Sequence, residues 1–225
     1  MGILKNAGLE RYGLDIFKDC HLFISARSPF ARRVRLALLE HEVPFKEEVV
    51  DLFGDVQTDC PGLLEANPLI RVPTVKLVGG QVLVDSHEIL SVFYASRESG
   101  WMPRDLPQRL PQAYWSGLAI GICELTIDYF FEMQRPEPNR NPERLEEIDL
   151  LIHRSLTVIE AEMSTRQGQP PKVLNQADLD LGTALGYLGI RYPADWRTKY
   201  PLTVVYHKGL ELRPSFKQTC PPAAT

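Results

Sequence analysis

The sequence predicts an α/β domain built on a mixed four-stranded sheet, followed by an all-helical domain. Over residues 20–100, short apolar segments alternate with helical patterns, whereas from Gln112 onward almost every long segment has the apolar period of a helix. A proline-rich linker separates the two patterns and contains Pro103, Pro107 and Pro111. We divide the chain into an amino-terminal extension (1–19), an α/β domain (20–100) and a helical domain (105–216).

The first domain begins with a strand, a tight turn and a helix. The run from Cys20 to Ile24 is typical of a short buried strand, and the segment from Pro29 to Glu42 carries apolar residues on one helical face. A second strand is expected over Phe45 to Val50. Because a helix joins the two strands, the pattern predicts that they pair in parallel.

The rest of this domain is predicted to be a short helix, a hairpin and a closing helix. Gly79-Gly80 is a turn signal between two apolar runs, Thr74 to Val78 and Gln81 to Val84, which favours an antiparallel pair. Leu63 to Asn67 precedes the pair as a short helix, and Ser86 to Ser96 follows it as a longer one. The order βαβ, connector, ββα has the layout of a thioredoxin-like domain.

One motif of the second domain marks a helix start. Asn175-Gln176-Ala177-Asp178 places a side-chain acceptor at the start and an acid three positions later, which is close to a capping box. The apolar side chains that follow share one helical face and are Leu181, Ala184, Leu185 and Leu188. We interpret this motif as structural.

Composition and charge argue against a nucleic-acid-binding protein and against a membrane-spanning protein. The 225 residues are 44% hydrophobic and 24% charged, as in a globular protein, and the formal charge is -4. Lys and Arg are scattered without a basic stripe, so no nucleic-acid partner is expected. No apolar run approaches the ~20 residues of a membrane-spanning helix, and Met1 to Asp19 lacks the apolar core of a signal peptide. We expect a cytoplasmic protein without a membrane partner.

The cysteines are widely separated in sequence, at Cys20, Cys60, Cys123 and Cys220. They form no Cys-x-x-Cys pair, and no His lies at metal-ligand spacing from them. Isolated cysteines suit a reducing compartment, so we interpret them as buried or incidental surface thiols. No metal is expected.

Three motifs of the first domain remain, and each has an ordinary structural explanation. Ser28-Pro29-Phe30 begins a helix, where Ser is a common cap and Pro fits the first helical position. Arg71-Val72-Pro73-Thr74 leads into a strand, where a proline is tolerated if its missing N–H is not needed. Val84-Asp85-Ser86 opens a second helix, again with a cap residue.

The order and separation of these motifs resemble the amino-terminal half of a glutathione S-transferase. The resemblance covers nearly the whole chain, from Leu22 to Pro222, and includes the ending Leu212-Arg213-Pro214-Ser215-Phe216. The Ser-Pro-Phe motif is similar to that of bacterial-type enzymes, of serine classes and of plant tau-class enzymes. The resemblance implies the glutathione S-transferase fold, a cytosolic homodimer, glutathione as co-substrate and a role in detoxification.

The resemblance also implies that Ser28 is the catalytic residue. A thiol attacks as its thiolate, and a free thiol with a pKa near ~8.5 is mostly protonated at neutral pH. A hydroxyl that donates to the sulfur, beside the positive end of a helix, stabilises the thiolate. Ser25 is a nearby competitor that falls in or just after the strand. Omega-like relatives carry Cys where Ser28 stands, so conjugation is favoured here over mixed-disulfide chemistry.

The same resemblance assigns glutathione binding to Arg71, Val72, Pro73, Asp85 and Ser86. A cis proline turns the preceding backbone toward the cysteinyl group of glutathione, an arginine pairs with a carboxylate, and the second helix start receives the γ-glutamyl end. The family often has Glu where Asp85 stands, and the shorter acid has less reach. An exposed loop arginine without a role is the alternative for Arg71.

Three aromatic residues, Phe30, Tyr114 and Trp115, are candidates to border a pocket for an apolar electrophile between the domains. Core packing is the competing interpretation for them. Two other functions stay open. One is a regulatory protein of the same fold that binds glutathione without turnover, and the other is a specialised lyase, dehalogenase or isomerase that uses the same thiolate.

A basic cluster lies early in the first helix, at Arg32, Arg33 and Arg35. These side chains are able to enrich anions locally, against the usual preference for acids at a helix start. We favour a solvated face, balanced by Glu40 and Glu42.

Overall fold

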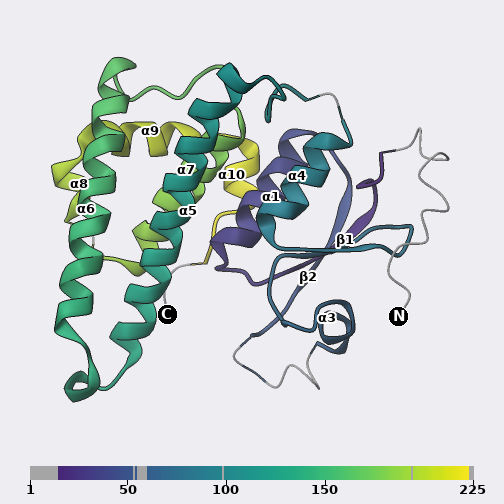
Figure 1. Ribbon diagram of the computed structural model, residues 1–225, viewed down its shortest axis with the longest axis horizontal. Helices are drawn as coiled ribbons and strands as arrows, with labels where there is room; N and C mark the ends of the chain where they lie inside the picture. Colours follow the sequence, from purple (N-terminus) through teal and green to yellow (C-terminus); the bar gives the residue numbers. More distant parts are fainter. Residues whose placement is uncertain (1–14, 53, 55–59, 98, 194, 223–225) are drawn as a thin grey trace. The chain divides into compact units, whose positions relative to one another are not determined.

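The computed structural model describes residues 15–52, 54, 60–97, 99–193 and 195–222 (Figure 1). The chain divides into two compact units, unit 1 over Met1–Ser99 and unit 2 over Gly100–Thr225. Unit 1 contains a mixed sheet and unit 2 is helical, so the predicted fold class is confirmed. Of the expected amino-terminal extension, residues 1–14 lie outside the described part of the chain.

Unit 1 alternates strands and helices in the predicted order. Helix α1 ends at Glu40 rather than at Glu42, because Glu42 has a φ of 54°, outside the right-handed helical region. The elements are β1 (Cys20–Ile24), α1 (Pro29–Glu40), β2 (Phe45–Val49), α3 (Pro61–Ala66), β3 (Thr74–Lys76), β4 (Val82–Val84) and α4 (Ser86–Ala95).

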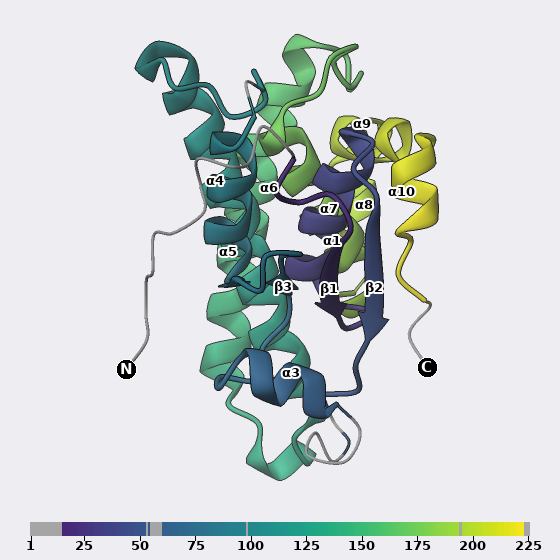
Figure 2. The same ribbon diagram turned by 90° about the vertical axis from the view of Figure 1, so that its right-hand side faces the viewer.

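The strands form one sheet in the order β2-β1-β3-β4, with β1 and β2 side by side in Figure 2. β1 pairs in parallel with β2, as the helical crossover requires, and antiparallel with β3, which in turn pairs antiparallel with β4. In this register Phe23 lies opposite Thr74, and Thr74 lies opposite Val84. The carboxyl end of β1, the start of β3 and the end of β4 therefore meet at one end of the sheet.

Helices cover both faces of this sheet. α1 and α4 pack against each other on one face, and α3 lies on the other (Figure 1). Side chains alternate along β1, so Leu22 and Ile24 point away from Phe23, which packs in a cluster with Cys60 and Leu63. Because both faces of β1 are apolar and buried, a slip in register would expose core side chains.

The residues that precede β1 belong to the core of unit 1. The side chain of Phe17 is fully buried, and its ring meets that of Phe93 edge-on, with the centroids 5.1 Å apart. The carboxylate of Asp15 forms an ion pair with Arg97. Residues 15–19, the last part of the expected extension, are thus fastened to α4 and to the segment that follows it.

All four cysteines are free thiols, as the sequence indicates. Cys20, Cys60 and Cys123 are buried, and Cys220 is exposed. Burial raises the pKa of Cys20 to about 12, so this side chain stays a neutral thiol at physiological pH.

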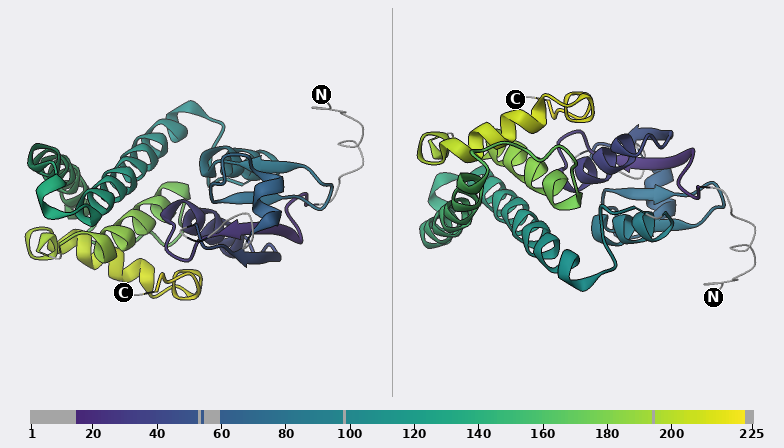
Figure 3. Two further views of the ribbon diagram at one scale, coloured as in Figure 1. Left: turned by 90° about the horizontal axis from the view of Figure 1, so that it is seen from below. Right: turned by 90° about the horizontal axis from the view of Figure 1, so that it is seen from above.

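Unit 2 is built from helices, of which α5 and α7 lie side by side (Figure 3). No helix in the described ranges is both long and apolar enough to span a membrane. The helices are α5 (Leu106–Gln134), α6 (Pro142–Thr165), α7 (Gln176–Arg191), α8 (Trp196–Lys199), α9 (Pro201–Glu211) and α10 (Pro214–Gln218), with a 3₁₀ turn, η2 (Glu137–Asn139), between α5 and α6.

The capping box predicted at the start of α7 is present. Asn175 Oδ1 accepts the N–H groups of Ala177 and Asp178 at 2.8 and 3.2 Å, and Asp178 Oδ2 accepts the N–H of Asn175 at 3.0 Å. The helix then runs through the core of unit 2, with Leu179, Ala184 and Leu188 fully buried.

His41 is the residue at which α1 ends, and its imidazole is partly buried. One ring nitrogen, Nδ1, lies 2.9 Å from the Ala37 carbonyl, and the other, Nε2, lies 3.0 Å from Ser99 Oγ. The ring packs edge-on against Phe93 and Tyr94. Burial lowers the pKa of His41 from its ordinary value of 6.5, because the charged imidazolium loses solvation.

We expect acid to weaken unit 1 through His41. Below about pH 6.5 the unfolded chain binds a proton at His41, whereas the folded chain binds it only at a lower pH, near the folded pKa. The stabilisation present above about pH 6.5 is therefore lost as the pH falls toward the folded pKa. Hydrogen exchange of the α1 amides between pH 7 and pH 5, corrected for intrinsic rates, should show this loss. His41→Asn should flatten the dependence. The exposed His87, changed to Asn, is the control, and an equal effect of both substitutions would refute the assignment.

Candidate functional site

The sheet register brings the three sequence motifs to one end of unit 1. Ser28 follows the carboxyl end of β1, Val72 and Pro73 precede β3, and Asp85 and Ser86 follow β4. Since Phe23, Thr74 and Val84 pair across these strands, the motifs leave the sheet at the same edge. Segments far apart in sequence thus converge.

Ser28 is the cap of α1. Its backbone is extended, with φ -69° and ψ 119°, and its Oγ accepts the Ala31 N–H at 3.2 Å. A hydroxyl that accepts one hydrogen bond keeps its own hydrogen for another acceptor. The side chain is half-buried, beside the positive end of α1. Ser25, the competing hydroxyl, follows β1 as expected, and its carbonyl accepts the Ser28 N–H at 3.0 Å.

The loop before β3 is held by a buried asparagine that the sequence interpretation missed. Asn67 is 2% exposed, and its Nδ2 donates to the Arg71 carbonyl at 3.0 Å and to Thr74 Oγ1 at 2.9 Å. Thr74 Oγ1 donates to the same carbonyl at 2.8 Å. The Val72–Pro73 peptide bond between these anchors is cis. The available signal was an Asn directly before Pro68, a typical turn pair.

Asp85 and Ser86 start α4. Asp85 Oδ1 accepts the N–H groups of His87 and Glu88 at 2.8 and 3.3 Å, so the capping expected from the sequence is present. The backbone of Asp85 has φ 71° and ψ 130°, a conformation that costs an amino acid other than glycine about 1–3 kcal/mol. Strain of this kind gathers at ligand sites in proteins. Ser86 is 5% exposed, and its Oγ accepts a hydrogen bond from Arg33 Nη1 at 3.1 Å.

The expectation of a solvated basic face on α1 is wrong. Arg32 and Arg33 are only 5% and 2% exposed. Arg35 binds Glu47 of β2, with Nε–Oε1 and Nη2–Oε2 distances of 2.8 and 2.9 Å. Because α1 packs against α4, part of its surface is covered, and the long aliphatic stems of Arg32 and Arg33 are buried.

Arg71, the remaining predicted cation, carries an exposed side chain, while its carbonyl is anchored by Asn67 and Thr74. The guanidinium is thereby presented to solvent from a fixed backbone. This placement suits a carboxylate partner, and it equally suits a loop arginine without a ligand.

Comparisons of the sequence and the structure with known proteins find similar proteins. Residues 27–96, which contain all three motifs, match the family model of the glutathione S-transferase N-terminal domain. A solved glutathione S-transferase from Methylobacterium radiotolerans, in complex with glutathione sulfonate, is 29% identical and has a TM-score of 0.80 over 92% of this chain and 97% of that one. Residues 27–96 belong to the glutathione S-transferase N-terminal domain family, and the chain has the fold of a glutathione S-transferase.

Two further relatives show how far the similarity to glutathione S-transferases extends. A solved glutathione S-transferase from Methylobacillus flagellatus with GSH bound is 26% identical, with a TM-score of 0.81 over 91% of this chain and 100% of that one. Glutathione S-transferase U1 of Arabidopsis thaliana is 32% identical over 90 residues. That match spans 40% of this chain and 38% of the plant protein, little more than a third of its length.

The aromatic residues that the sequence predicts to border a second pocket lie in different surroundings. Phe30, on α1 of unit 1, is half-buried. On α5 of unit 2, Tyr114 is 55% exposed, and its ring meets that of Trp115 edge-on at 5.1 Å. Successive helical residues are about 100° apart, so Trp115 shares the face of the buried Ile122 while Tyr114 points elsewhere. Trp115 therefore faces the core side of α5.

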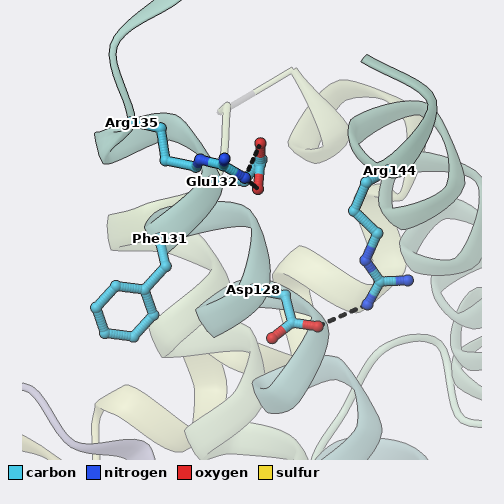
Figure 4. Close-up of a pocket in the computed structure, with 5 residues that line it drawn as sticks. All are labelled: Asp128, Phe131, Glu132, Arg135 and Arg144. Carbon is cyan, nitrogen blue, oxygen red and sulfur yellow. Dashed lines mark hydrogen bonds and ion pairs between the residues drawn. The ribbon is translucent and has the colours of Figure 1, made fainter. Parts of the chain in front are cut away.

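A pocket of about 210 Å³ lies where α5 and α6 approach each other (Figure 4). Arg144 Nη2 binds Asp128 Oδ2 at 2.6 Å, Arg144 Nη1 binds Glu147 Oε2 at 2.6 Å, and Arg135 Nη1 binds Glu132 Oε2 at 3.2 Å. Glu132 Oε1 also accepts a backbone N–H, which lowers the pKa of Glu132. The charges that line this pocket neutralise one another and fasten α5 to α6.

The chemistry of the site in unit 1 rests on hydroxyl groups, helix starts and a buried guanidinium. In the described part of the chain, no set of three or more His, Cys, Asp and Glu side chains is arranged to hold a metal ion. The side chains present are suited to bind a peptide carboxylate and to stabilise a negatively charged sulfur.

Proposed function

We propose that this protein is a cytoplasmic glutathione transferase that activates the glutathione thiolate for attack on an apolar electrophile. The observation that carries the proposal is the position of Ser28, a capping hydroxyl at the same end of the sheet as Val72 and Ser86. Complexes of the two bacterial relatives with glutathione sulfonate and with GSH support a glutathione site.

In the proposed mechanism, the Ser28 hydroxyl donates a hydrogen bond to the glutathione sulfur. Its Oγ is already aligned by the Ala31 N–H at 3.2 Å, and the first turn of α1 adds its positive end. Each unit by which the thiol pKa falls corresponds to about 1.4 kcal/mol in favour of the thiolate. The thiolate then forms a bond to the electrophilic carbon, and the displaced electron pair leaves with the leaving group or moves into a conjugated acceptor.

The rest of the tripeptide is assigned to the two other motifs. The backbone of Val72, before the cis Pro73, would pair with the cysteinyl group, and Arg71 would contact a carboxylate. Asp85 and Ser86 would receive the γ-glutamyl end at the start of α4. Asp85 Oδ1 is engaged in capping, so Oδ2 is the oxygen that remains for a ligand amine. Two anchored backbones, one before β3 and one before α4, preorganise these contacts.

The second substrate is proposed to be apolar, and conjugation would detoxify it. Phe30, Tyr114 and Trp115 stay the proposed contacts, because aromatic side chains offer large apolar surfaces. Substitution of Phe30 by Ala should raise the KM for the electrophile more than the KM for glutathione.

The function is tested by two measurements on the full chain. Calorimetric titration with glutathione should show saturable binding, and a panel of electrophiles, including aryl halides, enones and epoxides, should reveal glutathione-dependent turnover. Saturable binding without turnover on any electrophile would favour a regulatory glutathione-binding protein. Absence of binding would overturn the proposed function.

We also propose a homodimer that buries one face of α5. This face carries Leu106, Leu110 and Phe131, which are 67%, 65% and 52% exposed, and two glycines, Gly117 and Gly121. A Cβ added at either glycine would meet no atom within 4 Å, so a second helix is able to approach closely there. These five positions fall within one helical stripe, opposite the buried Ile122.

We expect Leu110→Glu to convert the dimer into a monomer, because a carboxylate would be desolvated in the apolar contact. Sedimentation equilibrium measures the change. Leu150→Glu is the matched control, since Leu150 is 49% exposed on α6, away from the stripe. A dimer that survives Leu110→Glu would contradict this interface.

A further inference from the structure

Asn67 is a buried amide at the end of α3, and each of its polar atoms is engaged within one loop. Its Oδ1 accepts the N–H of Leu69 at 3.0 Å, the turn that an asparagine commonly forms with the residue two positions later. Its Nδ2 reaches further and donates to the Arg71 carbonyl at 3.0 Å and to Thr74 Oγ1 at 2.9 Å. The local turn accounts for Oδ1 only, so the two hydrogen bonds of Nδ2 serve a later part of the loop.

These hydrogen bonds hold the Arg71 carbonyl from two sides. Asn67 Nδ2 donates to this oxygen at 3.0 Å, and Thr74 Oγ1 donates to it at 2.8 Å, so both of its lone pairs are occupied. Thr74 is fully buried and lies opposite Phe23 and Val84 in the sheet. The carbonyl is therefore fastened to the core of unit 1, and it is unable to turn without breaking two hydrogen bonds.

The anchored carbonyl fixes the direction of the Val72 N–H. The two groups belong to one planar trans peptide, in which C=O and N–H point in opposite directions. Because the carbonyl points toward Asn67 and Thr74, the N–H points away from them. The Val72 side chain packs against the apolar cluster around Phe23. Within the described ranges the Val72 N–H forms no backbone hydrogen bond, which leaves this donor for a ligand.

We propose that Asn67 is a positioning residue for the cysteinyl carbonyl of glutathione, acting through the Arg71–Val72 peptide. This inference rests on the proposed function, in which the backbone of Val72 pairs with the cysteinyl group. A backbone N–H only donates, so its partner in that group is the carbonyl oxygen. Asn67 does not touch the ligand. It keeps the N–H aligned before glutathione binds, so that binding does not have to order the loop.

The test compares glutathione with its (E)-alkene isostere, in which CH=CH replaces the amide between cysteine and glycine. The isostere keeps both charged ends and the planar link but lacks the cysteinyl carbonyl and the glycyl N–H. Calorimetric titration of the wild-type chain should show tighter binding of glutathione. In Asn67→Ala this preference should fall about tenfold, the size of one hydrogen bond, because the Val72 N–H is no longer held in line. The affinity for the isostere should change little.

Thr74 provides a second variant, because its hydroxyl holds the same carbonyl. Thr74→Val has nearly the same shape without the hydroxyl, and it should lower the preference for glutathione as well. Thr74→Ser keeps the hydroxyl and should retain most of the preference. Leu22→Val is the matched control, since it trims a fully buried side chain that points away from Phe23 on β1. It should leave the preference unchanged.

Equal losses for glutathione and the isostere in Asn67→Ala would show a merely structural role and overturn the inference, as would an undiminished preference. If Asn67→Ala does not fold, an undiminished preference in Thr74→Val would overturn it instead. Wild-type protein that binds the two ligands equally would overturn the inference and leave the proposed function standing. Wild-type protein that binds neither ligand would refute the proposed function.

Discussion

Ser28→Ala is expected to lower kcat/KM for glutathione conjugation by about 100-fold, the typical loss when one donor to a developing or resident anion is removed. Glutathione binding should change much less, because the contacts assigned to Val72, Asp85 and Ser86 stay in place. The reason is that Ser28 would act on the charge of the sulfur and not on the peptide. Steady-state kinetics with a responsive electrophile, together with calorimetric titration, separates the two effects.

Two matched variants keep this result interpretable. Ser28→Thr retains both the cap on α1 and the hydroxyl, so most of the activity should remain. Ser25→Ala removes the nearby hydroxyl and keeps the Ser25 backbone carbonyl, which accepts the Ser28 N–H at 3.0 Å. Loss of the Ser28 cap costs about 1 kcal/mol of stability in its own right, so activity is to be compared well below the unfolding transition. A large loss in Ser25→Ala, with none in Ser28→Ala, would transfer the role to Ser25.

Asp178→Ala is expected to cost about 3 kcal/mol of stability, the largest structural effect we predict. Asp178 Oδ2 accepts the backbone N–H of Asn175, the cap residue of α7, and Asp178 Oδ1 accepts a hydrogen bond from the Tyr206 hydroxyl at 2.8 Å. Tyr206 is fully buried, and burial together with the Asp178 carboxylate raises its pKa, so the phenol stays a donor. Without Asp178 this donor would be left in the core without that acceptor.

Urea unfolding followed by tryptophan fluorescence measures this loss, because all three tryptophans lie in unit 2, at Trp101, Trp115 and Trp196. Asn175→Ala removes the cap but keeps the Tyr206 contact, so it should cost only about 1 kcal/mol. Equal losses in the two variants would mean that the Tyr206 hydrogen bond contributes nothing.

Local sequence signals were sufficient for most of the fold. Gly79-Gly80 predicted the hairpin, and Ser28, Asp85 and Asn175 predicted three helix starts, because turns and caps depend on residues within a few positions of one another. The convergence of the site motifs then follows from the strand order, which the βαβ and ββα patterns largely determine.

Contacts between distant segments escaped the sequence interpretation. Arg33 was expected in solvent, since three arginines early in a helix give no sign of which face the sheet and α4 will cover. Its bond to Ser86 joins residues 53 positions apart. Asn67 was missed because its hydrogen bonds depend on how the loop up to Thr74 folds. The helical pattern that ends at Asn67 gives no sign of them.

The central claim is that Ser28 stabilises a bound thiolate, and an ultraviolet difference titration of glutathione on the protein tests it most directly. The thiolate absorbance is followed across pH for the wild-type chain and for Ser28→Ala. We predict a bound thiol pKa below that of free glutathione, and loss of this lowering in the variant. Saturable binding with no lowering of the thiol pKa, or a lowering that persists in Ser28→Ala, would contradict the account.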